Sequence, residues 1–394
     1  MTINKTHWLF KISLLSLSFF LMMAPQISTA LPLMLSAFPL VDQANVEALV
    51  TIPNVGILIG LFLNPFLVRI IGRKATVLVG LVITLLAGAF PIVSAQFWPI
   101  FGSRLLLGAG IGLYNSFAVS LIGEFYRDDE ETLATMLGYQ IMTGAIGGAV
   151  SSFLVSFLLT LGWHAAFAIY LLAVPAIILF GLFVSIHDEK QGHQNGKHAS
   201  LIAAIHQLNS RVWIITGLAL ILYILFLPTS YKLPVFVSEN QLGTSSQLAQ
   251  IMAVATLMSI PIGLFFGRIY KYLKDRLFPL SLGLITIGYV LLAFAQVFWM
   301  VMIGLLVMYF GFFALVTYLY NWLSWAAPEG SLNLATTAVL ISTNLGVFIS
   351  PYVMNGLTHL FGGQSSRLVL ILGAIGFLGL AIYAAVHYLS VHKH

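Results

Sequence analysis

The chain has 394 residues, of which 60% are hydrophobic and only 7% are charged. A soluble globular domain carries about 25% charged residues, so this composition excludes a chain surrounded by water and predicts an integral membrane protein. The net charge of +5 comes from basic residues in short segments between apolar runs, which is typical of membrane orientation rather than nucleic-acid binding.

Twelve apolar runs are long enough to cross the membrane as helices, because about 20 residues span ~30 Å of hydrocarbon. The first run resembles a signal peptide with a cleavage site near Ala30, but it continues to Met34 and is expected to remain as a helix. The approximate limits of the twelve predicted helices are 9–35, 46–70, 75–96, 98–124, 132–160, 164–186, 212–237, 248–272, 277–297, 299–324, 333–358 and 366–389. The pattern predicts an all-α membrane protein.

The basic residues predict which side of the membrane each loop faces. With a cytoplasmic N-terminus, fourteen of the 17 fall on the inner side, and the exceptions are Lys232, Arg367 and, within the fourth helix, Arg104. The fourteen are Lys5, Lys11, Arg69, Arg73, Lys74, Arg127, Lys190, Lys197, Arg211, Arg268, Lys271, Lys274, Arg276 and Lys393. Both termini are therefore predicted to be cytoplasmic in a multi-pass protein of the cell membrane.

The longest polar connection lies at the middle of the chain. It predicts two six-helix bundles, 1–186 and 212–394, joined by a cytoplasmic linker over 187–211. A faint repeat supports the two halves: the residues from Ile59 to Phe62 recur 203 positions later, and Pro25 corresponds to Pro228 at the same offset. The glycines of the fifth helix correspond to Gly346 and Pro351 of the eleventh. Many transporters are built from such repeats.

Several motifs stand at fixed places in this topology. Gly72, Arg73 and Lys74 end the loop after the second helix, and a degenerate copy runs from Gly267 to Arg276 after the eighth. The fourth helix has Arg104 followed by Gly108, Gly110 and Gly112, and it closes with Glu124. Thr143 to Gly148 form a glycine-rich stretch in the fifth helix, and Gly162 to Phe167 lead into the sixth.

These motifs resemble those of the major facilitator superfamily, most nearly its bacterial twelve-helix drug:proton antiporters. The resemblance implies two pseudo-symmetric bundles and a central cavity lined by helices one, four, seven and ten. Three positions depart from the family pattern. Pro65 stands where the loop signature begins with glycine, Arg69 stands where it has aspartate, and Gly144 stands where the antiporter motif has proline.

Polar and amphipathic residues within the apolar runs are the candidates for a substrate cavity. They are Gln26, Asn54, Arg104, Tyr114, Asn115, Tyr139, Gln140, Tyr223, Tyr231, Tyr309, Tyr318, Asn321 and Asn344. The alternative for each is a hydrogen bond that joins two helices. Together with the phenylalanines of the tenth helix, they predict an aromatic, weakly charged pocket that suits a lipophilic or amphipathic solute.

Arg104 lies inside the fourth helix, where a charge is costly and usually marks a substrate or ion path. It is expected either to bind an anionic substrate or to tune a proton carrier; the alternative is an arginine that extends to the outer headgroups. The other candidates for proton coupling are Asp42, Glu47 and Glu124. No acidic residue is expected at a helix centre, so coupling is implied mainly by the resemblance.

Two further groups have predicted mechanical roles. Arg69, Gly72, Arg73 and Lys74 are expected to form a cytoplasmic gate with Glu124 and the acidic run 128–131, or else only exposed ion pairs of ~0–1 kcal/mol each. Bending of helices is expected at Pro25 and Pro228, which each remove a backbone hydrogen bond, and at Gly144, Gly147 and Gly148.

The leading hypothesis is a proton-coupled exporter of amphipathic or drug-like solutes, working as a monomer by alternating access. The alternative is an uptake symporter or facilitator for a small organic anion held by Arg104 and Lys232. No protease, phosphate-loop or nucleophile motif is present, and the absence of cysteine excludes thiolate chemistry, so an enzyme is not predicted. The linker histidines His187, His193, His198 and His206 fit no metal pattern, and no cofactor or nucleic acid is expected.

Overall fold

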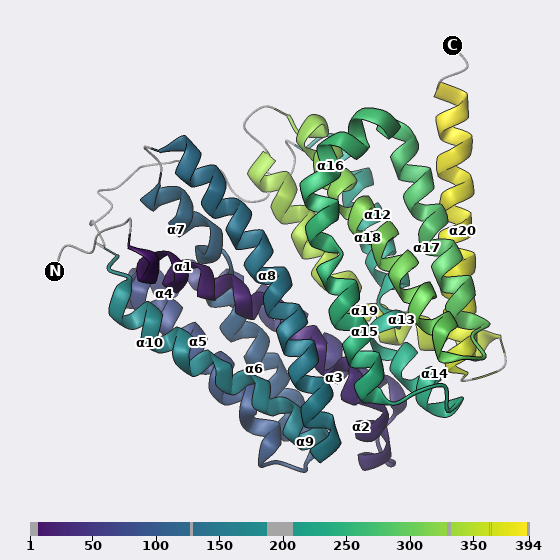
Figure 1. The fold of residues 1–394 in the computed structure, drawn as a ribbon, viewed down its shortest axis with the longest axis horizontal. Helices are drawn as coiled ribbons and strands as arrows, with labels where there is room; N and C mark the ends of the chain where they lie inside the picture. Colours follow the sequence, from purple (N-terminus) through teal and green to yellow (C-terminus); the bar gives the residue numbers. More distant parts are fainter. Residues whose placement is uncertain are drawn as a thin grey trace. The chain divides into compact units, whose positions relative to one another are not determined.

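The computed structural model describes residues 7–126, 129–186, 208–328, 332–361, 363 and 365–391, which form helices without strands (Figure 1). This confirms the predicted all-α class. Some predicted residues lie outside this part of the chain: Lys5, Arg127, Asp128, Lys190, Lys197, Lys393 and the linker up to 207. The side chains of Glu130 and Glu131 also lie outside the described part.

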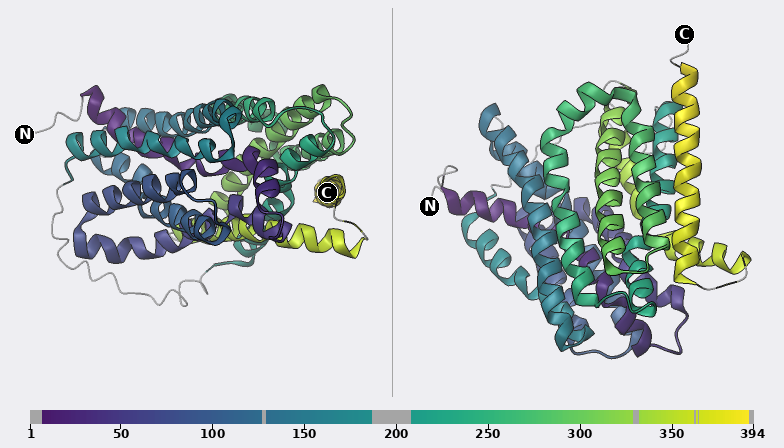
Figure 2. Two further views of the ribbon diagram at one scale, coloured as in Figure 1. Left: turned by 90° about the horizontal axis from the view of Figure 1, so that it is seen from below. Right: turned by 45° about the vertical axis from the view of Figure 1, so that its right-hand side comes forward.

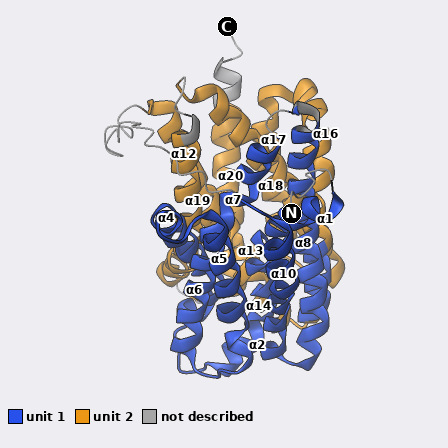
Figure 3. Cartoon of the chain, turned by 90° about the vertical axis from the view of Figure 1, so that its left-hand side faces the viewer, with its two compact units in different colours: residues 1–193, 245–253 blue, residues 194–244, 254–394 orange. Residues whose placement is uncertain are grey.

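The chain divides into two compact units (Figure 3). Unit 1 holds residues 1–193 and 245–253, and unit 2 holds 194–244 and 254–394. The predicted boundaries at 186 and 212 stay a prediction, because most of the linker lies outside the described residues.

The helices of unit 1 follow one another without long loops. They are α1 Trp8–Leu21, η1 Ala24–Ala30, α2 Leu31–Ala37, α3 Gln43–Thr51, α4 Pro53–Ile71, α5 Arg73–Ala89, η2 Phe90–Ile92, α6 Phe97–Asn115, α7 Phe117–Phe125, α8 Glu130–Leu158, η3 Leu159–Leu161, α9 Trp163–Ala166, η4 Phe167–Leu172 and α10 Ala173–Phe183.

Unit 2 repeats the pattern of long helices with short breaks. Its helices are α12 Ser210–Phe226, α13 Pro228–Tyr231, α14 Leu233–Glu239, α16 Ser259–Leu273, η5 Lys274–Arg276, α17 Leu277–Ala293, α18 Phe298–Ala326, α19 Leu332–Leu360 and α20 Ser366–Val391. Helix α15, Ser245–Leu257, begins in unit 1 through its residues 245–253 and ends in unit 2.

Ten helices among the described residues are long and apolar enough to cross a membrane, and the bent pair Trp8–Leu21 and Ala24–Ala37 adds an eleventh if it is one span. One of the ten, Ser245–Ala293, has 49 residues. A straight helix of that length would be about 74 Å long, more than twice the hydrocarbon thickness. Figures 1 and 2 show the chain turning back at η5, where Lys274 has a φ of 45°. With this run counted as two, the described helices account for the twelve predicted crossings.

Glycines bring α4 and α6 into backbone contact. A Cβ atom added at Gly108 would overlap the carbonyl oxygen of Pro53, and one at Gly56 would overlap that of Leu105. Small residues of this kind let membrane helices approach closely. The glycines of the fourth predicted helix therefore serve helix packing in unit 1.

Helix α8 is one continuous helix from Glu130 to Leu158, and the bending expected at its glycines stays a prediction. A Cβ atom at Gly147 would overlap the carbonyl oxygen of Phe19 on α1, whereas Gly144 leaves 3.6 Å to Ser18. Gly147 therefore sets the distance between α1 and α8.

We expect Gly108→Ala to destabilise the protein by about 1–3 kcal/mol, because the added methyl group must push α4 and α6 apart. Gly102→Ala on the same helix is the matched control, since nothing lies within 4 Å of its added Cβ. Thermal unfolding of both purified variants, followed by intrinsic fluorescence, measures the difference. Equal unfolding midpoints would contradict this account of the interface.

Candidate functional site

The first predicted helix is broken in unit 1. Helix α1 ends at Leu21, η1 begins at Ala24 with Pro25 in its first turn, and the two parts meet at 42°. Proline has no N–H group, so the helical hydrogen bond to the carbonyl of Leu21 is missing here. Such breaks are stable inside a membrane only where other groups pair with the backbone. The Nε2 atom of Gln26 donates to the carbonyl of Met22 at 3.0 Å.

Arg104 supplies the second donor at this break. Its Nη2 atom donates to the carbonyl of Ala24 at 3.1 Å, and its Nε atom donates to the carbonyl of Leu49 at 3.1 Å. Its Nη1 atom donates to the hydroxyl of Tyr170 at 2.7 Å, and the guanidinium lies 5.6 Å from the ring centroid of Phe167. One side chain on α6 thereby joins η1, α3 and η4.

Arg104 is only 1% exposed, so its guanidinium is enclosed by unit 1 instead of extending to the surface. Within the described residues, three of its five N–H groups donate hydrogen bonds, two of them to backbone carbonyls. The prediction of an interior arginine fits this placement. The role of Arg104 as a substrate ligand or as a group that tunes a proton carrier stays a prediction.

The three acidic candidates for proton coupling lie in different surroundings. Asp42 is exposed and caps α3 by accepting a hydrogen bond from the backbone of Ala44 at 3.1 Å. Glu124 is half exposed and forms an ion pair. Glu47 is fully buried in α3, two residues before Leu49, whose carbonyl binds Arg104. Of the three, Glu47 has the enclosed position that a proton-carrying carboxyl group needs.

Two of the predicted gate residues, Arg73 and Lys74, have contacts within unit 1. The Nη1 atom of Arg73 lies 2.5 Å from Oε2 of Glu124, and its Nη2 atom lies 3.3 Å from Oε1, so the pair is two-pronged. Lys74 donates from Nζ to the carbonyl of Gly181 at 2.7 Å. Gly72 joins α4 to α5 with a φ of 83°, which favours glycine. Arg69 is exposed in the last turn of α4.

The seventh predicted helix is broken in unit 2 as the first is in unit 1. Helix α12 ends at Phe226 and α13 begins with Pro228, so the carbonyl of Ile224 has no helical donor. The hydroxyl of Ser350 on α19 donates to it at 2.7 Å. Because Ser350 has one hydrogen, the 3.0 Å contact with Tyr231 requires the tyrosine hydroxyl to donate.

Tyr289 on α17 completes the pairing at this break. Its hydroxyl oxygen lies 2.6 Å from the carbonyl oxygen of Leu225 and 3.0 Å from that of Phe226, so its single hydrogen is shared between the two. Its ring packs against Gly373 on α20, where a Cβ atom would lie 2.7 Å away. Lys232, which separates α13 from α14, is 1% exposed.

Five aromatic side chains of α12 and α18 lie beside this break and are called the aromatic ladder: Tyr223, Phe226, Tyr309, Phe312 and Phe313. The rings of Phe226 and Phe312 are stacked at 3.5 Å between centroids and 9° between planes. Tyr223 meets Phe312 edge-on at 5.5 Å, and Tyr309 lies 5.5 Å from Phe226 and 5.7 Å from Phe313. The five rings therefore pack against one another beside the break in the seventh predicted helix.

The structure separates Tyr318 from this ladder. It lies in the C-terminal half of α18 and contacts Tyr270 of α16 and Phe278 of α17. Its hydroxyl donates to Asp275 at 3.4 Å. Asn321, one turn further on, accepts a hydrogen bond from Trp325 at 3.4 Å.

Two of the other cavity candidates donate to nearby backbone carbonyls. Asn54 donates to the carbonyl of Thr51 at 3.0 Å, and Asn344 donates to that of Leu340 at 2.8 Å. Tyr114 is fully buried, and its hydroxyl has no hydrogen-bond partner within the described residues. Asn115 and Gln140 are partly buried, and Tyr139 is exposed.

We expect Arg104→Lys to lower the thermal midpoint of unfolding, because one ammonium group cannot reach acceptors on η1, α3 and η4 together. Each buried acceptor left unpaired costs about 1–3 kcal/mol. Arg268→Lys is the matched control, since Arg268 is exposed on α16. Midpoints lowered equally in both variants would refute a special role for the three hydrogen bonds.

The comparisons with known proteins concern the whole chain. Solved structures similar to it include a mutant form of the nucleoside transporter NupG, with 13% identity, a TM-score of 0.82 and coverage of 96% of this chain and 99% of that one. The POT family transporter PepTSo has 12% identity, a TM-score of 0.76 and coverage of 98% of each chain. The peptide transporter POT in complex with sulfate has 12% identity, a TM-score of 0.74 and coverage of 100% and 97%.

At such identities the likeness to these transporters establishes the fold. No curated protein sequence matches the chain. The family model of the Major Facilitator Superfamily matches residues 12–351. The chain therefore belongs to the Major Facilitator Superfamily.

Proposed function

We propose that this member of the superfamily moves a small, weakly charged amphipathic solute across the cell membrane by alternating access. The observation that carries the proposal is the aromatic ladder beside the break at Pro228. Stacked rings offer an apolar face to a planar or lipophilic solute, and aromatic contacts contribute about 0.5–1.5 kcal/mol beyond the area they bury. The broken first and seventh helices supply segments that can change angle without losing all of their backbone pairing.

The hydrogen bonds that Arg104 already makes favour an uncharged or cationic solute over a small anion. Its donors bind two carbonyls and a tyrosine hydroxyl, so an anion would have to displace existing hydrogen bonds. The organic-anion alternative rests on Lys232, which is enclosed at the break of the seventh helix. The nucleoside of the NupG transporter carries a planar base, and the ladder would suit such a ring as well as a drug-like one.

Proton-coupled export is the direction and coupling we propose, with Glu47 as the proton carrier. A buried carboxyl group is costly to ionise, so protonation can be coupled to a change in its surroundings. Glu47 lies on α3, two residues before Leu49. The carbonyl of Leu49 accepts a hydrogen bond from Arg104, which joins α3 to α6. The basic residues of the inner loops support cytoplasmic termini, and we propose a monomer as the working unit.

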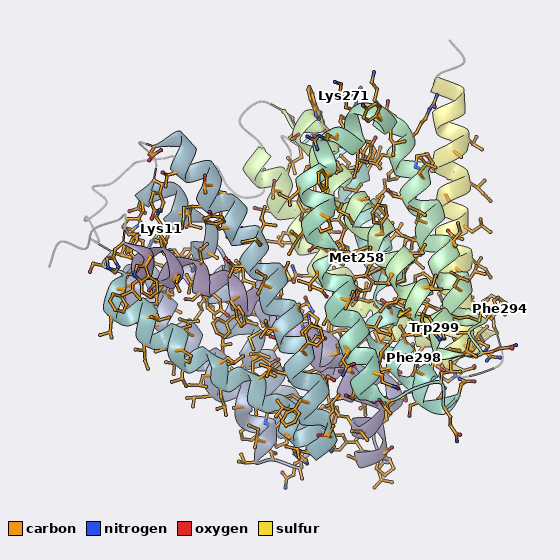
Figure 4. The ribbon with its side chains drawn as sticks, in the orientation of Figure 1. Lys11, Met258, Lys271, Phe294, Phe298 and Trp299 are labelled. Atoms are coloured by element: carbon orange, nitrogen blue, oxygen red, sulfur yellow. The ribbon has the colours of Figure 1, made fainter. Side chains whose placement is uncertain are left out.

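The first experiment measures accumulation of a fluorescent lipophilic cation in cells, with amphipathic drugs and nucleosides as competitors. We expect lower accumulation with the wild type than with empty vector, and a protonophore should abolish the difference. Phe312→Ala should raise the half-saturating concentration of the best competitor about tenfold, since it removes the stacked ring. Phe294→Ala is the control, because Phe294 (labelled in Figure 4) is 58% exposed and outside the ladder.

Accumulation equal to empty vector with every competitor would refute export of amphipathic solutes. Uptake of an anion that is lost in Lys232→Gln would establish the alternative.

The second experiment separates coupling from binding in proteoliposomes. Glu47→Gln is expected to abolish transport driven by a pH gradient, because glutamine cannot release a proton, while solute exchange without a gradient continues. Asp42→Asn, at an exposed capping position, should leave both activities intact. Gradient-driven transport that persists in Glu47→Gln would exclude Glu47 as the carrier.

A further inference from the structure

A groove of about 440 Å³ lies on unit 2 between α17 and α20, which run side by side in Figures 1 and 2. It is lined by Arg276, Pro279, Leu280, Ala381, Ile382 and Ala385. Ala381 and Ala385 stand one helical turn apart, and their small side chains leave the depression. Leu280 and Ile382 are 49% and 56% exposed at its sides. The groove is therefore apolar, open and part of a segment long enough to cross the membrane.

One end of this groove is basic. Lys274 and Arg276 lie in the turn between α16 and α17, and Lys271 lies in the last turn of α16 (labelled in Figure 4). All three are exposed. Asp275 is the one acidic residue between 271 and 276, and it accepts a hydrogen bond from Tyr318 on α18. The turn thus carries a net positive charge where the apolar lining ends.

The spacing along α17 matches the boundary between headgroups and hydrocarbon. Arg276 precedes Pro279 and Leu280 by three and four residues, so its backbone lies about 5 Å further along the helix axis. Arginine binds phosphate oxygens through two parallel N–H groups. Basic residues next to a membrane attract anionic lipids by about 1 kcal/mol each.

We propose that this groove binds an anionic phospholipid of the surrounding bilayer. The phosphate group interacts with Arg276, and one acyl chain lies against Ala381, Ala385 and Ile382. The volume falls within the roughly 300–1,000 Å³ range of small-molecule sites. The lipid site is separate from the aromatic ladder and does not depend on which solute is transported.

The test is native mass spectrometry of the purified full-length protein in detergent, titrated with phosphatidylglycerol or with phosphatidylcholine of the same acyl chains. We expect about fivefold stronger retention of phosphatidylglycerol, matching one basic contact. Arg276→Gln should abolish this preference, and Ala381→Leu should reduce retention of both lipids by filling the groove.

Two control variants keep the result specific. Arg268→Gln removes the same charge from α16, outside the groove lining, and Gly379→Leu adds bulk on α20 where no atom lies within 4 Å of an added Cβ. Both should retain lipid as the wild type does. Equal retention of the two lipids by the wild type would overturn the proposal, as would losses of equal size in the control variants. Thermal unfolding without lipid identifies any variant that fails to fold. If Ala381→Leu fails to fold, the lipid preference of Arg276→Gln decides the outcome, because Arg276 is exposed.

Discussion

A broken helix inside a membrane exposes backbone carbonyls that water cannot reach, and both units are organised around pairing them. In unit 1 a guanidinium from α6 binds a carbonyl of the broken first helix. In unit 2 two hydroxyls, from α17 and α19, bind the carbonyls of the broken seventh helix. Pro25 and Pro228 occupy equivalent positions in the repeat, but the side chains that bind the nearby carbonyls differ in chemistry. A guanidinium binds a carbonyl beside the first break, and hydroxyl groups bind carbonyls beside the second.

The remaining packing in each unit keeps these partners in place. Tyr170, which receives a hydrogen bond from Arg104, lies against Gly88 so closely that a Cβ atom there would be within 2.8 Å of several of its atoms. Tyr289 lies against Gly373 in the corresponding way. Both tyrosines are fully buried, so each hydroxyl is held by a ring that cannot move without displacing a neighbouring helix. The glycine contacts between α4 and α6 fix the helix that carries Arg104.

The sequence predicted the features that depend on local pattern. Apolar runs gave the helices, Pro25 and Pro228 marked the places where they break, and the depth of Arg104 within an apolar run indicated an interior charge. Features that depend on tertiary contacts could not be predicted from the local sequence. Nothing local distinguishes Ser350 or Tyr289 from other polar residues of membrane helices, and their role follows only from the carbonyls they face. Tyr318 was grouped with Tyr309 because both lie on one helix, yet nine residues of separation place it in another aromatic cluster. From the sequence Glu47 is one of three acidic candidates for proton coupling, and the fold shows that it alone of the three is completely buried.

The hydrogen bonds at the seventh helix also have a direction, and this determines which substitutions leave the backbone paired. Tyr231 donates to Ser350, and Ser350 donates to the carbonyl of Ile224, so the serine serves as acceptor and donor at once. Replacing Ser350 with alanine removes both of these hydrogen bonds in a single step, whereas replacing Tyr231 with phenylalanine leaves the carbonyl of Ile224 paired. Substitutions at the two positions are therefore not equivalent. A chain that loses only the tyrosine keeps the carbonyl of Ile224 paired, whereas a chain that loses the serine leaves this carbonyl without its hydroxyl donor.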